Sequence, residues 1–255
     1  MQLLGYGATS AKLAHAEQEH PEYLSAILFL KPHRSGDGIH NTCHNATVGC
    51  AGVCYDTFGR GLFPNVNASR TRKTRDFFAD PRGFVDRLKH DIRAGIRRAA
   101  REGREFCARL NGTSDVPWEK IRGSNGLTVY EQFDGEHGDP WTRFWDYSKD
   151  RARVMANAIP NLHLTFSASE LTTAAEIDEC IAAGVSCAVV MDHAKYDAPT
   201  EWQGHRCTDG DAHDFRWLDK PTAYPRGVIV ALSAKGLARQ DTTGFRHTAE
   251  IRVAA

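Results

Sequence analysis

Short apolar runs alternate with helical stretches along most of this chain, and this alternation narrows the choice of folds. Six runs have the length and composition of buried strands, and they span residues 24–30, 105–110, 142–147, 162–167, 186–191 and 227–232. Strands joined by helices pair in parallel, because the connection has to return from one end of the sheet to the other. The pattern therefore predicts a parallel α/β fold.

The longest helical stretch runs from about residue 68 to Glu102. Apolar residues recur there at i, i+4 spacing, with Arg and Lys on the other faces, which is typical of a helix packed on a core. Asp80-Pro81 predicts a break, since proline fits the first position of a new helix. Shorter helices are expected at residues 150–158 and 173–183.

Polar residues follow nearly every expected strand. They are Asn111, Ser114, Asp115, Asp146, Lys149, Ser167, Glu170 and Asp192. Because ligands of parallel α/β folds bind at the carboxyl ends of the strands, these residues are candidates for a pocket. Each one could equally serve as an ordinary turn or helix-cap residue. We expect one domain over residues 1–255, a partial (β/α)6-type TIM-like barrel with 1–20 and 240–255 peripheral, and an open doubly wound sheet as the alternative.

Three cysteines lie close together in the loop after the first expected strand. Cys43, Cys50 and Cys54 have the spacing C-x6-C-x3-C, among Gly, Ala, Asn and Thr residues. Thiolates held this close need a cation to share their charge, and the spacing does not resemble the paired C-x2-4-C of zinc sites. The loop therefore predicts an iron–sulfur cluster rather than three unrelated core thiols.

Composition and charge argue against a membrane-spanning protein, a secreted protein and a protein whose overall charge attracts nucleic acid. The 255 residues include 41% hydrophobic residues, enough for a sizeable core, and 32 basic against 32 acidic residues give no global field. No apolar run approaches 18 residues, and no signal peptide is evident at the N-terminus, so a cytoplasmic protein without a membrane partner is expected. Seven cysteines in such a protein are better interpreted as reduced thiols and ligands than as disulfides.

The charge is uneven along the chain. Between Arg70 and Arg104 there are 12 Lys or Arg against 5 Asp or Glu, while acids dominate between Asp192 and Asp219. The basic segment could contact nucleic acid phosphates, or it could be a solvated helix face that pairs with acidic neighbours.

Several segments of the chain resemble the bacteriophage gene product 88 family, whose proteins are uncharacterised. The resemblance rests on the cysteine loop with Cys54-Tyr55 and on five further segments, which together cover roughly residues 20–240: 109–115, 144–149, 164–170, 209–214 and 228–236. It implies a phage-encoded protein that acts in the cytoplasm of the host cell.

A looser resemblance connects the cysteine loop with the radical S-adenosylmethionine enzymes. Those enzymes use a partial barrel with three cysteines after the first strand, which hold a [4Fe–4S] cluster. Their spacing is C-x3-C-x2-C, and their Gly-Gly-Glu motif is absent here, where Asn111-Gly112-Thr113 takes its place. The resemblance implies the barrel and the cluster, and the missing motif argues against binding of S-adenosylmethionine.

The possible functions of the cluster differ according to whether the protein supplies a fourth ligand. Cys207 lies in a polar stretch after the fifth expected strand and is the candidate for the fourth ligand. Cys107, Cys180 and Cys187 are expected to be small buried apolar residues. Four cysteine ligands would give a closed [4Fe–4S] cluster with an electron-transfer, redox or structural role and an unknown small molecule or redox partner. Three would leave an iron open, as in a radical enzyme. A zinc-stabilised binding module is the third possibility, and whether the protein is an enzyme stays open.

Overall fold

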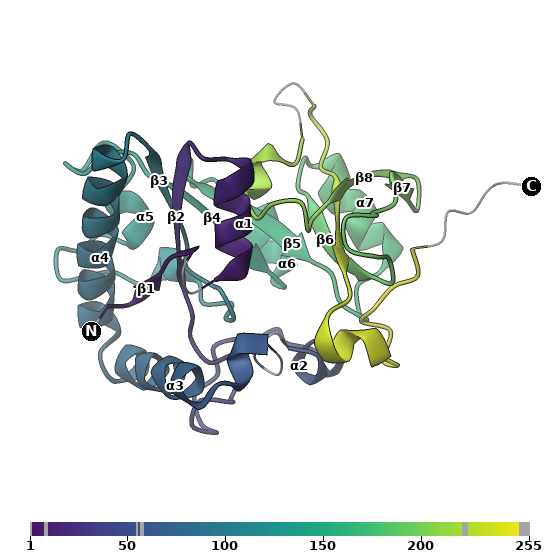
Figure 1. Cartoon of the computed structure of the whole chain (residues 1–255), viewed down its shortest axis with the longest axis horizontal. Coiled ribbons are helices and arrows are strands. Elements are labelled where there is room, and N and C mark those ends of the chain that lie inside the picture. The colour runs from purple at the N-terminus through teal and green to yellow at the C-terminus, as the bar shows by residue number, and fades with distance from the viewer. Residues whose placement is uncertain (1, 8–9, 55, 57–58, 221–223, 250–255) are drawn as a thin grey trace, which may run out of the picture. The chain divides into compact units, whose positions relative to one another are not determined.

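The computed structural model describes residues 2–7, 10–54, 56, 59–220 and 224–249 (Figure 1). The chain divides into two compact units that interleave along the sequence. The first contains residues 1–44, 60–146 and 158–163, and the second contains residues 45–59, 147–157 and 164–255.

The first unit is built on strands β1 to β4. They are β1 (Leu4–Gly5), β2 (Tyr23–Leu28), β3 (Glu105–Arg109) and β4 (Arg143–Ser148), of which β4 runs on into the second unit. β2 and β3 pair in parallel, with Ser25 opposite Cys107, and β3 pairs in parallel with β4. β1 pairs antiparallel with β2. The five residues of β2 after Tyr23 are all buried, as expected of a strand covered on both faces.

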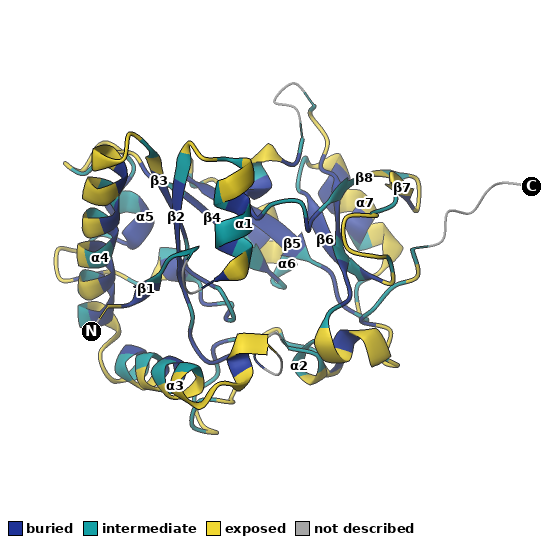
Figure 2. Cartoon of the chain, in the orientation of Figure 1, coloured by how far each residue is buried: buried dark blue, intermediate teal, exposed yellow. Residues whose placement is uncertain are grey.

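Helices α1, α3, α4 and α5 belong to the first unit. They span Ala11–Glu19, Pro64–Ala79, Pro81–Arg101 and Val129–Gln132. Asp80 forms the predicted break, because its backbone N–H ends α3 while its side chain accepts a 2.9 Å hydrogen bond from the Gly83 nitrogen at the start of α4. The apolar stripe of α4 is buried and its other side is exposed (Figure 2). A Cβ at Gly95 would overlap the ring of Phe106, so α4 approaches β3 closely at this glycine.

Several basic side chains of residues 70–104 have acidic partners within the first unit. Arg93 forms a 2.6 Å ion pair with Asp139, and Arg98 pairs with Glu102 at 2.7 Å. These pairs fit the interpretation of a solvated helix face. A nucleic-acid contact by this segment stays a prediction.

The second unit contains the remaining strands, paired in the order β5-β6-β9-β8-β7. They are β5 (Leu162–Ser167), whose first two residues belong to the first unit, β6 (Cys187–Met191), β7 (Glu201–Trp202), β8 (His205–Asp209) and β9 (Ile229–Ser233). β5, β6, β9 and β8 are parallel, whereas β7 returns antiparallel to β8 through a tight turn at Gln203-Gly204. Both turn residues have positive φ, as a two-residue hairpin requires. The helices of this unit are α2 (Val48–Gly52), α6 (Arg151–Met155) and α7 (Ala174–Ala182).

The α/β class and the mostly parallel pairing are confirmed, and the TIM-like barrel is not. The sheet is open, since its order ends at β1 and at β7, each of which pairs with a single neighbour among the described residues. All six expected strands form, as β2, β3, β4, β5, β6 and β9. Residues 1–20, expected to be peripheral, contribute β1 and the buried side chains of α1, and residues 250–255 lie outside the described residues.

Candidate functional site

The seven cysteines separate into two groups by burial. Cys43, Cys50 and Cys54 are half-buried, whereas the four others are buried: Cys107, Cys180, Cys187 and Cys207. Burial raises the pKa of the Cys107 thiol. The pKa of the Cys187 thiol is raised chiefly by a hydrogen bond with Cys180 and also by burial. The thiols of the loop are therefore the ones that solvent and a ligand can reach.

Cys50 lies on the short helix α2, which begins after Thr47. The Thr47 hydroxyl accepts a 3.2 Å hydrogen bond from the backbone nitrogen of Cys50. Glu170, which follows β5, holds the same turn from outside. One of its carboxylate oxygens accepts from the Gly49 nitrogen at 2.8 Å and the other from the Thr47 hydroxyl at 2.7 Å. The helix that carries Cys50 is thus fixed to the carboxyl end of β5.

The electrostatics around Glu170 favour its charged form. Burial alone would raise the pKa of this carboxyl group, but the hydrogen bonds from Gly49 and Thr47, together with the nearby Lys149 ammonium, hold the pKa below its usual value. Gly49 leaves no room for a side chain, because a Cβ there would lie 2.7 Å from a Glu170 oxygen and closer still to the hydroxyl of Thr243.

Lys149 and Ser167 lie together in the second unit, next to the segment of Glu170. The Lys149 ammonium donates to the Ser167 hydroxyl at 3.1 Å, to the Ser167 carbonyl at 3.2 Å and to the Ala168 carbonyl at 3.0 Å. It also lies 4.9 Å from the centre of the Phe245 ring. Lys149 therefore fastens the end of β5 and supports the charge of Glu170.

Cys43 lies at the carboxyl ends of β2 and β3, in the first unit. Its sulfur is 3.7 Å from the carbonyl oxygen of Thr113, which follows β3, and 3.7 Å from the hydroxyl of Thr42. The backbone nitrogen of Asp115 donates to the Thr42 carbonyl at 2.8 Å. Cys43 therefore lies beside the segment that follows β3.

Asn111, Ser114 and Asp146, which the sequence analysis assigned to a pocket, come together in a buried network. The Asn111 amide nitrogen donates to Asp146 at 3.0 Å, and its oxygen accepts from the Ser114 hydroxyl at 2.8 Å. Asp146 also accepts from the Asn111 backbone nitrogen at 3.1 Å, and Arg109 lies 3.5 Å from the same carboxylate. Asn111 and Asp146 are 1% and 0% exposed. These groups stabilise the turn after β3 and satisfy one another.

Cys207 lies in a strand and not in the loop expected from the sequence. Main-chain pairing puts Phe166, Cys187, Ile229 and Cys207 at one level across β5, β6, β9 and β8. Three strand spacings separate Phe166 from Cys207, which is about 14 Å. Cys207 is level with the first residues of β6 and β9, whereas Cys50 is tied to Glu170 beyond the end of β5. The structure does not bring Cys207 to Cys50.

The Cys207 thiol is also held in its neutral form. Burial raises its pKa to about 12, with Glu201 adding to the shift, and its sulfur lies 3.8 Å from the carbonyl oxygen of His205. Within the described part of the chain, no group of three or more His, Cys, Asp or Glu side chains is arranged to hold a metal ion.

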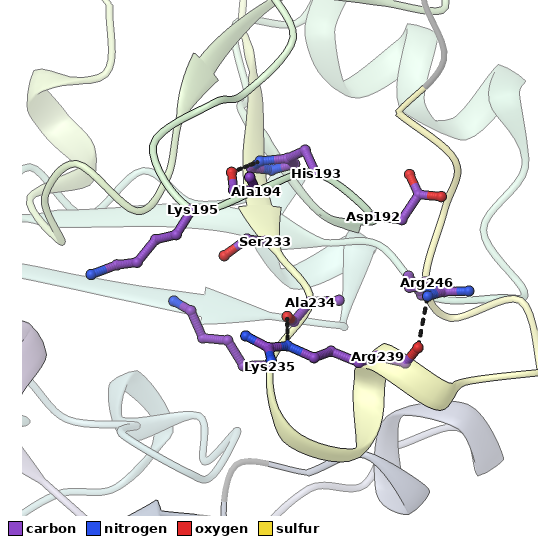
Figure 3. Close-up of a pocket in the computed structure, with 9 residues that line it drawn as sticks. All are labelled: Asp192, His193, Ala194, Lys195, Ser233, Ala234, Lys235, Arg239 and Arg246. Carbon is purple, nitrogen blue, oxygen red and sulfur yellow. Dashed lines mark hydrogen bonds between the residues drawn. The ribbon is translucent and has the colours of Figure 1, made fainter.

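Asp192 lines a hollow at the carboxyl ends of β6 and β9 (Figure 3). None of its other lining residues was among the predicted pocket residues. They are His193, Ala194, Lys195, Ser233, Ala234, Lys235, Arg239 and Arg246. The available signal was the basic residues that directly follow the two strands, Lys195 and Lys235.

The family model of gene product 88 matches residues 3–249, nearly the whole chain. The protein belongs to the gene product 88 family. This confirms the resemblance to the phage family, while the resemblance to the radical S-adenosylmethionine enzymes receives no support from the comparison. No curated protein and no solved structure matches the chain. Among the described residues, no helix is both long and apolar enough to cross a membrane.

Proposed function

We propose that this gene product 88 protein binds an iron–sulfur cluster through Cys43, Cys50 and Cys54. The observation that carries the proposal is the division of the cysteines, in which these three thiols are half-buried and the other four are buried. A thiol must lose its proton to bind iron, and partial exposure makes that loss far less costly than it is in an apolar core. The spacing along the chain allows the three sulfurs to reach one cluster.

Hydrogen bonds and close contacts hold the segments that carry Cys50 and Cys43. Thr47 and Glu170 fix the first turn of α2, so Cys50 is presented from a defined backbone. Cys43 has the Thr113 carbonyl and the Thr42 hydroxyl within 3.7 Å. The Thr42 hydroxyl donates its proton to the Lys31 carbonyl, so toward the Cys43 sulfur it acts as an acceptor.

The proposal assigns three of four ligand positions to the loop and does not use Cys207. The burial and the raised pKa of that thiol, and its place near the amino ends of β6 and β9, argue against the closed four-cysteine site. When bound, the cluster would supply either one-electron transfer or an iron with an open position. The thiols that would bind the cluster stay reduced in a reducing compartment, and the cytoplasm of a host cell is one.

The experiment is anaerobic reconstitution with iron and sulfide, followed by iron and sulfide analysis, visible absorption and electron paramagnetic resonance of the reduced protein. Wild type should hold a [4Fe–4S] cluster, and Cys43→Ala, Cys50→Ala and Cys54→Ala should each lose most of it. Cys180→Ala and Cys207→Ala are the matched controls, and both should keep the signal. If the protein is instead colourless and contains stoichiometric zinc, the zinc-stabilised binding module replaces the iron–sulfur protein as the proposed function.

Addition of S-adenosylmethionine tests the role of the cluster. An unchanged resonance signal supports a redox or structural role, and a shifted signal supports the open-iron enzyme. If Cys207→Ala loses the cluster, Cys207 is a ligand and the hypothesis of a four-cysteine site is supported.

A further inference from the structure

The hollow at the carboxyl ends of β6 and β9 is a second candidate site, distinct from the cysteine loop. It has a volume of about 350 Å³ and lies within the second unit. Asp192 to Lys195 follow β6, and Ala234 to Arg246 follow β9, so both walls come from the ends of neighbouring parallel strands (Figure 3). This is the edge at which open parallel sheets bind their ligands, and the volume falls in the range of small-molecule sites.

The lining is strongly basic. Lys195, Lys235, Arg239 and Arg246 contribute four cations, against the single carboxylate of Asp192. Asp192 is itself engaged, since one of its oxygens accepts a 2.7 Å hydrogen bond from the Ala249 nitrogen. The lining therefore has a positive net charge that a bound anion would balance.

The two arginines are oriented by the backbone and not by acids. The Arg239 Nε donates to the Ala234 carbonyl at 3.3 Å, and an Arg246 terminal nitrogen donates to the Arg239 carbonyl at 2.7 Å (Figure 3). In the described part of the chain, neither guanidinium forms an ion pair with a carboxylate. Each guanidinium has five N–H donors, so most of them remain available to a ligand.

The end of β9, which forms one wall of the hollow, is held by hydrogen bonds to Asp211. Buried Asp211 accepts from the Ser233 nitrogen at 2.9 Å and from the Ser233 hydroxyl, and it pairs with the Lys235 ammonium. Burial would raise the pKa of Asp211, but the bonds from Lys235 and Ser233 lower it below its usual value. Asp211 thus balances Lys235 and leaves three cations for an anion: Lys195, Arg239 and Arg246.

We propose that this hollow binds the phosphate group of a small molecule. A phosphate monoester carries close to two negative charges and three acceptor oxygens, which match two arginine forks and a lysine. A carboxylate carries one charge and would be balanced by a single arginine. Lys195 lies on the exposed loop after β6 and donates to the Tyr196 hydroxyl at 2.5 Å, so it can swing onto the ligand.

The test is isothermal titration calorimetry of the whole protein with inorganic phosphate and with pyrophosphate, at constant ionic strength. Wild type should bind at least one of them saturably, one per chain. The double variant Arg239→Gln/Arg246→Gln should bind at least tenfold more weakly. Arg226→Gln, which removes an exposed arginine of the same unit outside the hollow, should bind like wild type.

A second variant is needed because both arginines also bond to the backbone, so the double variant could lose binding by misfolding. Lys195→Gln changes an exposed side chain and should weaken binding severalfold with an unchanged circular dichroism spectrum. The proposal is overturned if wild type binds neither anion saturably, or if both pocket variants bind as wild type does. It is also overturned if a single-stranded oligonucleotide binds through the same arginines more tightly than pyrophosphate, since the ligand would then be nucleic acid.

Discussion

The carboxylate of Glu170 accepts a 2.8 Å hydrogen bond from the backbone nitrogen of Gly49. This bond joins residues that are 121 positions apart in the sequence, and it fixes the helix on which Cys50 lies to the end of β5. The conformation of the cysteine loop therefore depends on the charge of Glu170, which lies outside the loop.

Protonation of Glu170 should release this anchor. The pKa of its carboxyl group is lowered in the folded protein, so its stabilising effect is fully present above the usual value of 4.5 and is lost as the pH falls through the lower, folded-state value. We expect the Gly49 amide resonance of metal-free protein to titrate with a midpoint below 4.5. The Glu170→Gln variant should lack this titration, and a midpoint at or above 4.5 in wild type would contradict the assignment.

Replacement of Gly49 by alanine should disrupt the loop. The new methyl group would overlap a Glu170 oxygen and the Thr243 hydroxyl, so we expect a loss of about 1–3 kcal/mol and poor cluster retention. Gly52→Ala is the matched control in the same helix, because a Cβ there meets nothing within 4 Å. Urea denaturation measures the loss of stability, and iron and sulfide analysis after reconstitution measures cluster retention. Equal stability of the two variants would show that the close contact is relaxed at no cost.

The thiols should differ widely in their reactivity. In metal-free native protein at mildly alkaline pH, iodoacetamide should modify Cys50 and the other loop cysteines first. Cys107 and Cys207 should react far more slowly, because burial raises the pKa of each thiol, to about 12 for Cys207. Peptide mass spectrometry over a time course gives the rates, and denatured protein provides the uniform reference. Modification of Cys207 as fast as Cys50 would contradict its placement in β8.

The buried network around Asn111 should be important for stability. Asn111→Ala removes hydrogen bonds to Asp146, Ser114 and the backbone of Val116, and it leaves the buried carboxylate with fewer donors. We expect a loss of roughly 3 kcal/mol in the free energy of unfolding by urea, against about 1 kcal/mol for Ser114→Ala. Similar losses for both variants would mean that Asp146 is compensated from elsewhere.

The strands of the fold were predictable where burial on both faces produces a continuous apolar run. β2, β3, β6 and β9 are largely of this kind, and Asp80-Pro81 marked the break between α3 and α4 by local chemistry alone. β5 instead alternates its apolar residues with His163, Thr165 and Ser167. β8 was missed because His205, Arg206, Thr208 and Asp209 give it the composition of a loop. It forms a strand because β9 supplies its main-chain partners, and nothing local indicates that pairing.

The candidate site shows the same limit. Asn111 and Asp146 were expected together because both lie toward the carboxyl ends of strands of one parallel sheet, and they are hydrogen-bonded. The basic hollow was missed because Arg239 and Arg246 come after the last strand. They reach the end of β6 through a return segment, in which the His247 nitrogen donates to the Val190 carbonyl at 2.8 Å. A contact between residues so far apart in the sequence has no local signal.

The position of β9 between β6 and β8 has a consequence for how the second unit is made. During synthesis β6 and β8 both leave the ribosome before β9, and neither can pair with its final neighbour on that side until residues 229–233 emerge. Until then two strand edges are open to wrong partners, including those of other nascent chains. The sheet of the second unit is completed by β9, which is inserted into its interior, so this unit can reach its final pairing only after residues 229–233 have been synthesised.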